Sequence, residues 1–272
     1  MKLMKLIAAF IALTCTLNAH AGFFSSPDGF KCGREDAVKT ISNYYRNDAL
    51  GLLQRDYITK TEFSYDKPIA AYQNKLNDLV VVASNVTTYD DSYYGLKCSA
   101  TISVKVPQEA LDVMTSVPKY LLFVTGNYSR LNNGNVVWSD VSYNVKLADN
   151  GKDVIFNPID NISLSKALFN ISVLSVDKDQ IINANSKDTL NSAKSEYKTS
   201  DRDLNSVWRD LPDSSRNALK KEQLAWVNTK VDKCGKLSDA ESDNVDMKQR
   251  IEIYQCQAKM TRERIDFLGG TI

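Results

Sequence analysis

The sequence predicts an α+β domain, made of a helix and an antiparallel sheet, followed by a small disulfide-stapled all-α helical domain. Three observations support this prediction. Residues 96–106 alternate between apolar and polar side chains, which is the pattern of a strand with one buried face. From Leu204 onward, the apolar residues recur at helical spacing instead. Beyond residue 21, each of these two parts holds two cysteines.

The first 21 residues have the pattern of a secretion signal. Lys2 and Lys5 give a positive start, and residues 6–17 form an apolar run that is too short to span a membrane. Ala19 and Ala21 then place small residues at the two positions that a signal peptidase reads. We therefore expect cleavage after Ala21 and a periplasmic or secreted protein. The alternative, a lipoprotein processed at Cys15, fits less well because residues 12–14 match that signal poorly.

Removal of this segment limits the chemistry available to the mature chain. Loss of Lys2 and Lys5 from the 34 basic residues leaves 32 against 33 acidic residues, a net charge of −1. Such a chain has no general basic field for nucleic acid. The one histidine, His20, is also removed, which excludes Ser-His-Asp and Cys-His nucleophiles and histidine-ligated metals.

Nucleotide-binding glycine motifs do not occur in the sequence either. The sequence therefore predicts a binding protein with no catalytic residue, cofactor or metal site. A glycosidase that uses two carboxylates is the remaining enzymatic alternative, and nothing in the sequence marks such a pair.

Residues 22–175 are predicted to form the α+β domain. Val38, Ile41 and Tyr45 give an apolar helical stripe near its start. The β-branched residues 79–90 and the alternating residues 96–106 predict two strands, with Cys98 on the buried face of the second.

The second half of this domain is also rich in predicted strands. A short helix is expected after Pro107, and residues 120–126 predict a strand. Residues 137–147 alternate again, and Asn150-Gly151 then predicts a tight turn into a return strand.

The second domain is predicted over residues 203–268, after a polar linker over residues 176–202, for which a partly helical conformation is an alternative. The last helix of this domain carries apolar residues at steps of four and three, the spacing of a seam that packs on a partner helix. The residues of that seam are Met247, Ile251, Tyr254, Ala258, Thr261, Ile265 and Leu268.

The mature chain has four cysteines, Cys32, Cys98, Cys234 and Cys256, and an even number in an exported protein indicates disulfides. Three connectivities are possible. The linker separates the cysteines into two pairs, which favours Cys32–Cys98 and Cys234–Cys256.

Three segments near the C-terminus carry a recognisable pattern: "LNSVWRDL", "RNALKKEQLAWVNTKVDKCG" and "YQCQAKMTRERIDFL". Together they resemble the LprI-type lysozyme inhibitor domain, whose pattern is L-N-x-x-[WY]-x-x-L, then L-x-x-[EA]-Q-x-x-W and a cysteine, then a second cysteine and T-x-x-R-x-x-x-L. The matching residues are Leu204, Asn205, Trp208, Leu211, Leu219, Glu222, Gln223, Trp226, Cys234, Cys256, Thr261, Arg264 and Leu268. One departure is "KVDKCG", where many members have an arginine-aspartate pair nearer the cysteine.

The resemblance implies an exported helical domain which, in at least one member of the family, is associated with inhibition of lysozyme. The matched residues themselves are expected to be structural, with Trp226 as the large apolar anchor of the bundle. No family resemblance is evident for residues 22–175.

Two hypotheses for function follow. The first is a protein that binds and inhibits lysozyme or another cationic muramidase by surface occlusion. It would use Asp239, Glu241, Asp243 and Asp246, which lie in a segment with five acidic and two basic residues. The alternative interpretation of this segment is a solvated interhelical loop that is acidic because it is exposed. The second hypothesis is a cell-envelope interaction or adaptor module without lysozyme activity, which would give the α+β domain a role.

Overall fold

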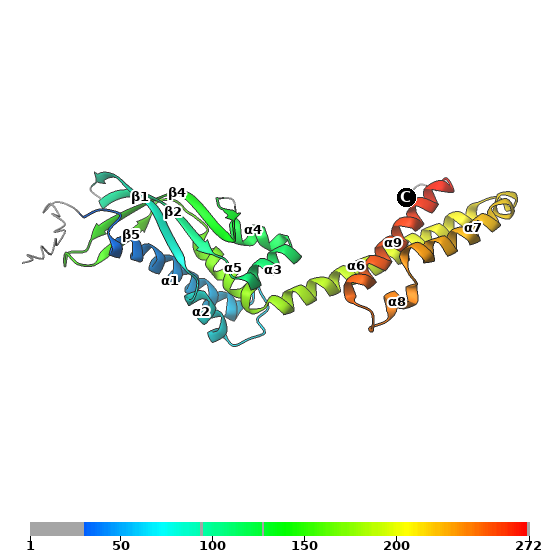
Figure 1. Cartoon of the computed structure of the whole chain (residues 1–272), viewed down its shortest axis with the longest axis horizontal. Helices are drawn as coiled ribbons and strands as arrows, with labels where there is room; N and C mark the ends of the chain where they lie inside the picture. Colours follow the sequence, from blue (N-terminus) through cyan, green and yellow to red (C-terminus); the bar gives the residue numbers. More distant parts are fainter. Residues whose placement is uncertain (1–29, 93–94, 127, 271–272) are drawn as a thin grey trace, which may run out of the picture.

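The computed structural model describes residues 30–92, 95–126 and 128–270, so the predicted signal segment lies outside the described residues. The molecule is elongated, with a body of helices and strands at one end and a bundle of helices at the other (Figure 1). One long helix connects the two. The predicted fold class is confirmed. No helix in the described part of the chain has the length and apolar character needed to cross a membrane.

The N-terminal body combines an antiparallel sheet with helices. Strand order is β1-β2-β4-β3, and β5 pairs with the C-terminal half of β4. In chain order its elements are α1 (Glu35–Thr59), α2 (Ile69–Asn77), β1 (Val81–Ser92), β2 (Gly95–Lys105), α3 (Gln108–Ser116), α4 (Lys119–Thr125), β3 (Arg130–Asn132), β4 (Asn135–Leu147), β5 (Val154–Pro158) and α5 (Leu164–Val176).

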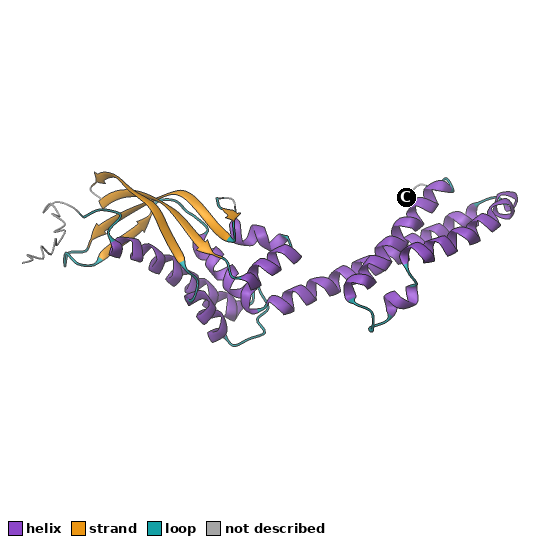
Figure 2. Ribbon diagram, in the orientation of Figure 1, coloured by secondary structure: helices purple, strands orange, loops and turns teal. Residues whose placement is uncertain are grey.

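The central pair of strands, β2 and β4, forms one side of the hydrophobic core. Cys98 lies opposite Tyr143 and Ile102 lies opposite Trp138, and all four side chains are fully buried. Helices α1 and α5 pack on this side of the sheet (Figure 2). Apolar and polar residues alternate along β2 because every second side chain of this strand faces the helices.

The hairpin predicted at Asn150-Gly151 is confirmed. Strand β4 turns into β5 with Leu147 opposite Val154, and Gly151 has φ +66°, a left-handed conformation that glycine adopts without strain. The strand predicted over residues 120–126 is wrong, because these residues form helix α4. A short apolar run has no periodicity that distinguishes a strand from a helix.

The segment that we predicted as a linker, residues 176–202, is helical from Lys178 onward. It belongs to α6 (Lys178–Asp210), which has 33 residues and contains neither glycine nor proline. Its buried residues are Ala193, Ser200 and Leu204, small or apolar side chains on the face that meets the last helix. The polar composition that suggested a linker thus belongs to the exposed faces of a helix.

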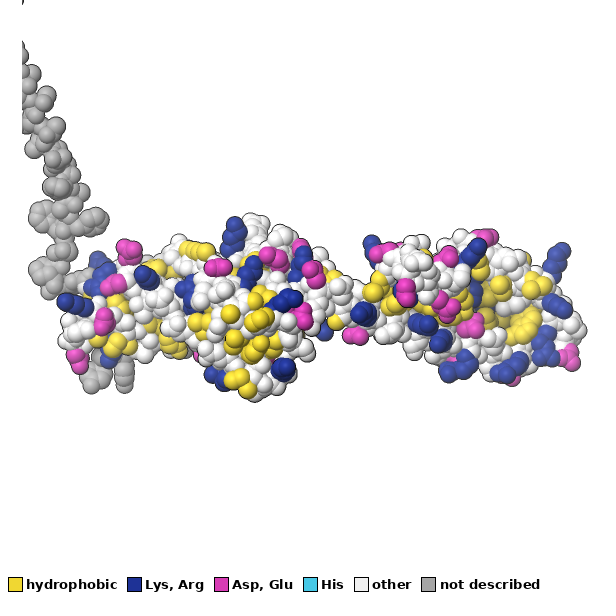
Figure 3. Space-filling view, turned by 90° about the horizontal axis from the view of Figure 1, so that it is seen from below, with side chains coloured by type: hydrophobic (Ala, Val, Ile, Leu, Met, Phe, Trp, Pro, Cys, Tyr) yellow, Lys and Arg dark blue, Asp and Glu magenta, His cyan; other side chains and the backbone are white. Residues whose placement is uncertain are grey.

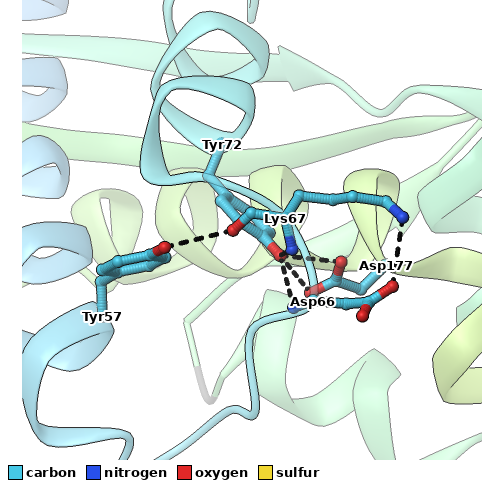
Figure 4. Close-up of polar contacts among 5 residues, drawn as sticks. All are labelled: Tyr57, Asp66, Lys67, Tyr72 and Asp177. Atoms are coloured by element: carbon cyan, nitrogen blue, oxygen red, sulfur yellow. Dashed lines mark hydrogen bonds and ion pairs between the residues drawn. The ribbon is translucent and has the colours of Figure 1, made fainter.

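A buried polar joint fixes the start of α6 on the N-terminal body (Figure 4). Asp177, between α5 and α6, is 3% exposed, and both of its carboxylate oxygens lie 2.8 Å from the Tyr72 hydroxyl, which donates to them. The same hydroxyl accepts hydrogen bonds from the backbone N–H groups of Asp66 and Lys67, at 3.1 and 3.0 Å. Tyr57 donates to the Lys67 carbonyl at 3.3 Å. Helix α2, the loop before it and α6 are therefore tied together at one point.

The C-terminal bundle contains the last part of α6 with α7 (Asp213–Cys234), α8 (Leu237–Glu241) and α9 (Met247–Phe267). Helix α9 packs along α6, and its buried residues include Tyr254, Ala258, Thr261 and Ile265 from the predicted seam. The structure contains both predicted disulfides, Cys32–Cys98 between the turn before α1 and β2, and Cys234–Cys256 between α7 and α9.

Candidate functional site

Helix α7 is held on α9 by charged and polar side chains as well as by the disulfide. Arg264 of α9 is 6% exposed and directs its guanidinium towards α7. Its Nε donates to Gln223 Oε1 and its Nη1 donates to Glu222 Oε1, both at 2.7 Å. Hydrogen bonds of this charge-assisted type are about twice as strong as neutral ones, so Arg264 joins the two helices firmly.

Trp226 does not fill an apolar core, contrary to the sequence-based expectation. Its side chain is only partly covered and lies beside two cations. The Lys230 ammonium is 4.9 Å from the centre of the indole, and the Arg264 guanidinium carbon is 5.8 Å from it. The aromatic face attracts positive charge, so Trp226 supplies the partner that these partly desolvated cations need.

Lys230 is the buried charge at the centre of this interface, with 6% of its surface exposed. Its ammonium donates to Thr261 Oγ1 at 3.3 Å, and it lies 5.7 Å from the Tyr197 ring. Burial lowers the pKa of Lys230 from its usual value. Thr261 in turn donates to the carbonyl of Gln257 at 2.7 Å. A chain of polar contacts therefore runs between α6, α7 and α9.

The end of α7 needs a glycine. Gly235 has φ +92°, and a Cβ at this position would lie 3.2 Å from Ile253 Cγ1. The Gln257 side-chain amide donates to the Gly235 carbonyl at 2.7 Å, next to the Cys234–Cys256 disulfide. These contacts fix the point at which the chain leaves α7 and enters α8.

The remaining residues of the family pattern lie at the helix contacts. Leu204 is buried on α6, while Trp208, Leu219 and Leu268 are partly covered. Most of the pattern therefore lies where α6, α7 and α9 meet. The roles of these residues stay a prediction.

The four acidic residues proposed to contact a partner have different environments. Asp239 and Glu241 are exposed on α8, which Ala240 anchors through its fully buried side chain. Asp243 is 96% exposed but pairs with Arg250 at 2.8 Å. The Asp246 carboxylate caps α9 by accepting from the N–H groups of Lys248 and Gln249, at 3.0 and 3.4 Å.

The structure also reveals exposed apolar side chains that sequence reasoning assigned to packing or passed over. Leu224 is 60% and Val227 is 40% exposed on α7, and Phe267 is 60% exposed at the end of α9. The Phe267 ring lies 4.4 Å from the Arg264 guanidinium. Hydrophobic side chains are visible among the charged ones on this bundle (Figure 3). Their spacing along α7 is helical, so only the tertiary structure could show that they face solvent.

Comparison with known proteins gives one match. Residues 182–268 match the family model described as "Lysozyme inhibitor LprI". No curated protein and no solved structure gives a significant match to the chain. The matched segment begins inside α6 and ends just after α9, so it covers most of the connecting helix together with the disulfide-stapled bundle. The C-terminal part of this chain therefore matches the LprI family model, as its sequence pattern predicted.

Proposed function

We propose that this protein is exported and that its C-terminal domain binds a lysozyme-type muramidase and inhibits it by covering part of its surface. The observation that carries the proposal is the match of residues 182–268 to a family of lysozyme inhibitors. The predicted signal segment over residues 1–21 supports the export.

The exposed acidic edge of the bundle supports a particular mode of binding. Asp239 and Glu241 on α8 and Asp243 just after it form this edge, while Asp246 is engaged at the start of α9. A cationic enzyme would be attracted to such an edge, and exposed charges mainly increase the association rate. We propose that these three carboxylates meet basic side chains beside the enzyme's cleft, with the disulfide keeping α8 in place.

The second candidate is a cell-envelope adaptor without lysozyme activity. The observation that favours it is the long helix α6, which separates a body of more than half the chain from the bundle (Figure 1). Two modules at a fixed spacing suit a protein that links two partners. In this case the family match would describe the fold of the bundle and not its target.

Both candidates are tested by titrating the oxidised mature chain into a lysozyme assay that follows clearing of a bacterial cell-wall suspension. The wild type is compared with Asp239→Lys/Glu241→Lys/Asp243→Lys, and with a control of equal charge change on α9, Glu252→Lys/Glu263→Lys/Asp266→Lys. The inhibitor proposal predicts dose-dependent inhibition that salt weakens, with at least a tenfold loss of potency in the first variant only. If no lysozyme type is inhibited, the inhibitor proposal is contradicted and the adaptor is the candidate that stands.

A further inference from the structure

A second candidate site lies in the N-terminal body, far along the chain from the LprI-family domain. Helix α1, the connection from β5 to α5 and the start of α5 surround a cavity of about 620 Å³, within the range of small-molecule sites. The residues that matter for the argument are Tyr44, Tyr45, Asp48, Tyr128, Asp160 and Ser163.

Two tyrosine rings are presented at this cavity. Tyr44 is 41% exposed, and its ring is held from behind by Tyr45 and Phe156, with centroid distances of 5.2 and 5.0 Å. Tyr128 also lines the cavity and is 72% exposed. A large aromatic surface fixed by its neighbours costs little conformational entropy when a ligand stacks on it.

Two buried hydroxyls at the cavity have no hydrogen-bond partner within the described part of the chain. One belongs to Tyr45, which is 3% exposed, and the other to Ser163 at the start of α5. A buried hydroxyl left unpaired is destabilising, and a ligand that pairs with it would remove this cost. Burial, with Tyr44, Asp160 and Asp48 nearby, raises the pKa of Tyr45 well above its usual value, so its hydroxyl stays neutral and both donates and accepts.

The charges around the cavity argue against a charged ligand. An anion would meet the carboxylates of Asp48 and Asp160, of which the second also accepts from the Ser142 N–H at 2.6 Å. A cation would meet the positive end of α5 and Lys166, which pairs with Glu62 at 3.1 Å. A neutral ligand that carries several hydroxyls and has apolar faces fits both sets of groups.

We infer that this cavity binds a neutral saccharide of a few units. The C–H faces of the sugar rings stack on Tyr44 and Tyr128, while the hydroxyls pair with Asp48, Tyr45 and Ser163. Gly126 leaves space beside the Ser163 hydroxyl. It has φ +57°, and a Cβ there would lie 2.9 Å from Ser163 Oγ. The inference concerns a different domain from the proposed lysozyme contact and does not depend on it.

The test uses the whole oxidised chain and neutral trisaccharides of glucose and of N-acetylglucosamine as probes, followed by saturation-transfer NMR and calorimetry. We expect binding of at least one trisaccharide, weakened at least tenfold by Tyr44→Ala and by Tyr128→Ala. Tyr89→Ala on β1 is the matched control, because Tyr89 is 64% exposed and lies outside the cavity lining, and it should leave binding unchanged.

Thermal melts of each variant separate a lost contact from a lost fold. Tyr128→Ala serves here as the safer variant, because its exposed side chain can be removed with little effect on stability. The inference is overturned if neither trisaccharide binds, or if binding survives in both cavity variants. Preferential binding of trilysine or of an anionic sugar would also overturn it.

Discussion

The Lys230 ammonium lies 4.9 Å from the centre of the Trp226 ring, one helical turn away on α7, and Arg264 of α9 approaches the same ring at 5.8 Å. The tryptophan of the family pattern is thus the shared partner of two cations at the α7–α9 contact. An apolar core was expected at this contact. Instead, charged side chains and the Trp226 ring form the interface between the two helices.

Replacement of Trp226 tests this interpretation. Trp226→Ala should lower the free energy of unfolding of the bundle by about 2 kcal/mol, because both cations lose their aromatic partner along with some packing. Trp226→Phe, which keeps a ring, should cost less than half as much. Urea unfolding followed by circular dichroism measures both. Leu224→Ala on the same helix, where Leu224 is 60% exposed, is the control and should change little. An equal cost for Ala and Phe at position 226 would contradict the account.

The joint at Asp177 should make stability depend on pH in the direction opposite to that of most carboxylates. Burial is the largest cause that raises the pKa of Asp177 from its usual value, and the hydrogen bond from Tyr72 only partly opposes it. The folded chain then keeps the Asp177 proton at pH values where the unfolded chain has lost it. The contribution of this group is therefore fully present below the unfolded pKa and is lost as pH rises through the folded pKa.

Asp177→Asn isolates this effect, because asparagine accepts the Tyr72 hydrogen bond but does not ionise. The stability of this variant relative to wild type should rise as pH increases from about 3.5 to 7, as measured by urea unfolding at each pH. Nearby Asp66 raises and Lys67 lowers the same pKa, and both are unchanged in the variant. If the relative stability of the variant is constant or falls with increasing pH, the pKa of Asp177 is not raised in the folded chain.

The two disulfides should differ in their contributions. Cys32–Cys98 spans 66 residues and Cys234–Cys256 spans 22. In the chain-entropy model, these loops correspond to about 4 and about 3 kcal/mol of stability. The paired Ser variants of each disulfide, compared with wild type in urea, give both values. We expect the bundle to lose more of its structure when its own disulfide is removed, since a small domain buries less surface.

Asp246 and its acidic neighbours should separate into structural and surface roles. Asp246→Ala removes the cap of α9 and should cost about 1 kcal/mol of stability. Glu241→Ala, at an exposed position on α8, should change stability by less than half of this amount. Thermal melts compare the two directly. An equal cost would mean that the α8 carboxylates are also part of the fold and are poor candidates for contacting a partner.

Much of the architecture was predictable from local patterns. Alternation predicted β2 and β4, the Asn150-Gly151 pair predicted the hairpin, and the family pattern identified the bundle. The separation of the four cysteines into two pairs along the chain predicted both disulfides. Each of these signals depends on residues close together in the sequence or on the positions of one residue type, such as cysteine.

The features that sequence patterns missed depend on tertiary context. Residues 120–126 are short and uniformly apolar, so no period distinguishes helix α4 from a strand. Helix α6 looked like a linker because most of its surface faces water, although the absence of glycine and proline from Lys178 to Asp210 was a usable helical signal. The burial of Lys230, the position of Trp226 and the cavity beside Tyr45 depend on contacts between distant segments, which no single-sequence pattern encodes.

The most direct test of the central claim is amide hydrogen exchange of the oxidised chain, alone and saturated with a strongly cationic lysozyme. The account predicts slower exchange over residues 237–246 in the complex and unchanged exchange in the α+β body that contains Tyr72 and Trp138. The charge-reversed variant at Asp239, Glu241 and Asp243 should lose this protection. Unchanged exchange over residues 237–246 at saturation, or protection confined to the N-terminal body, would contradict the proposed lysozyme contact.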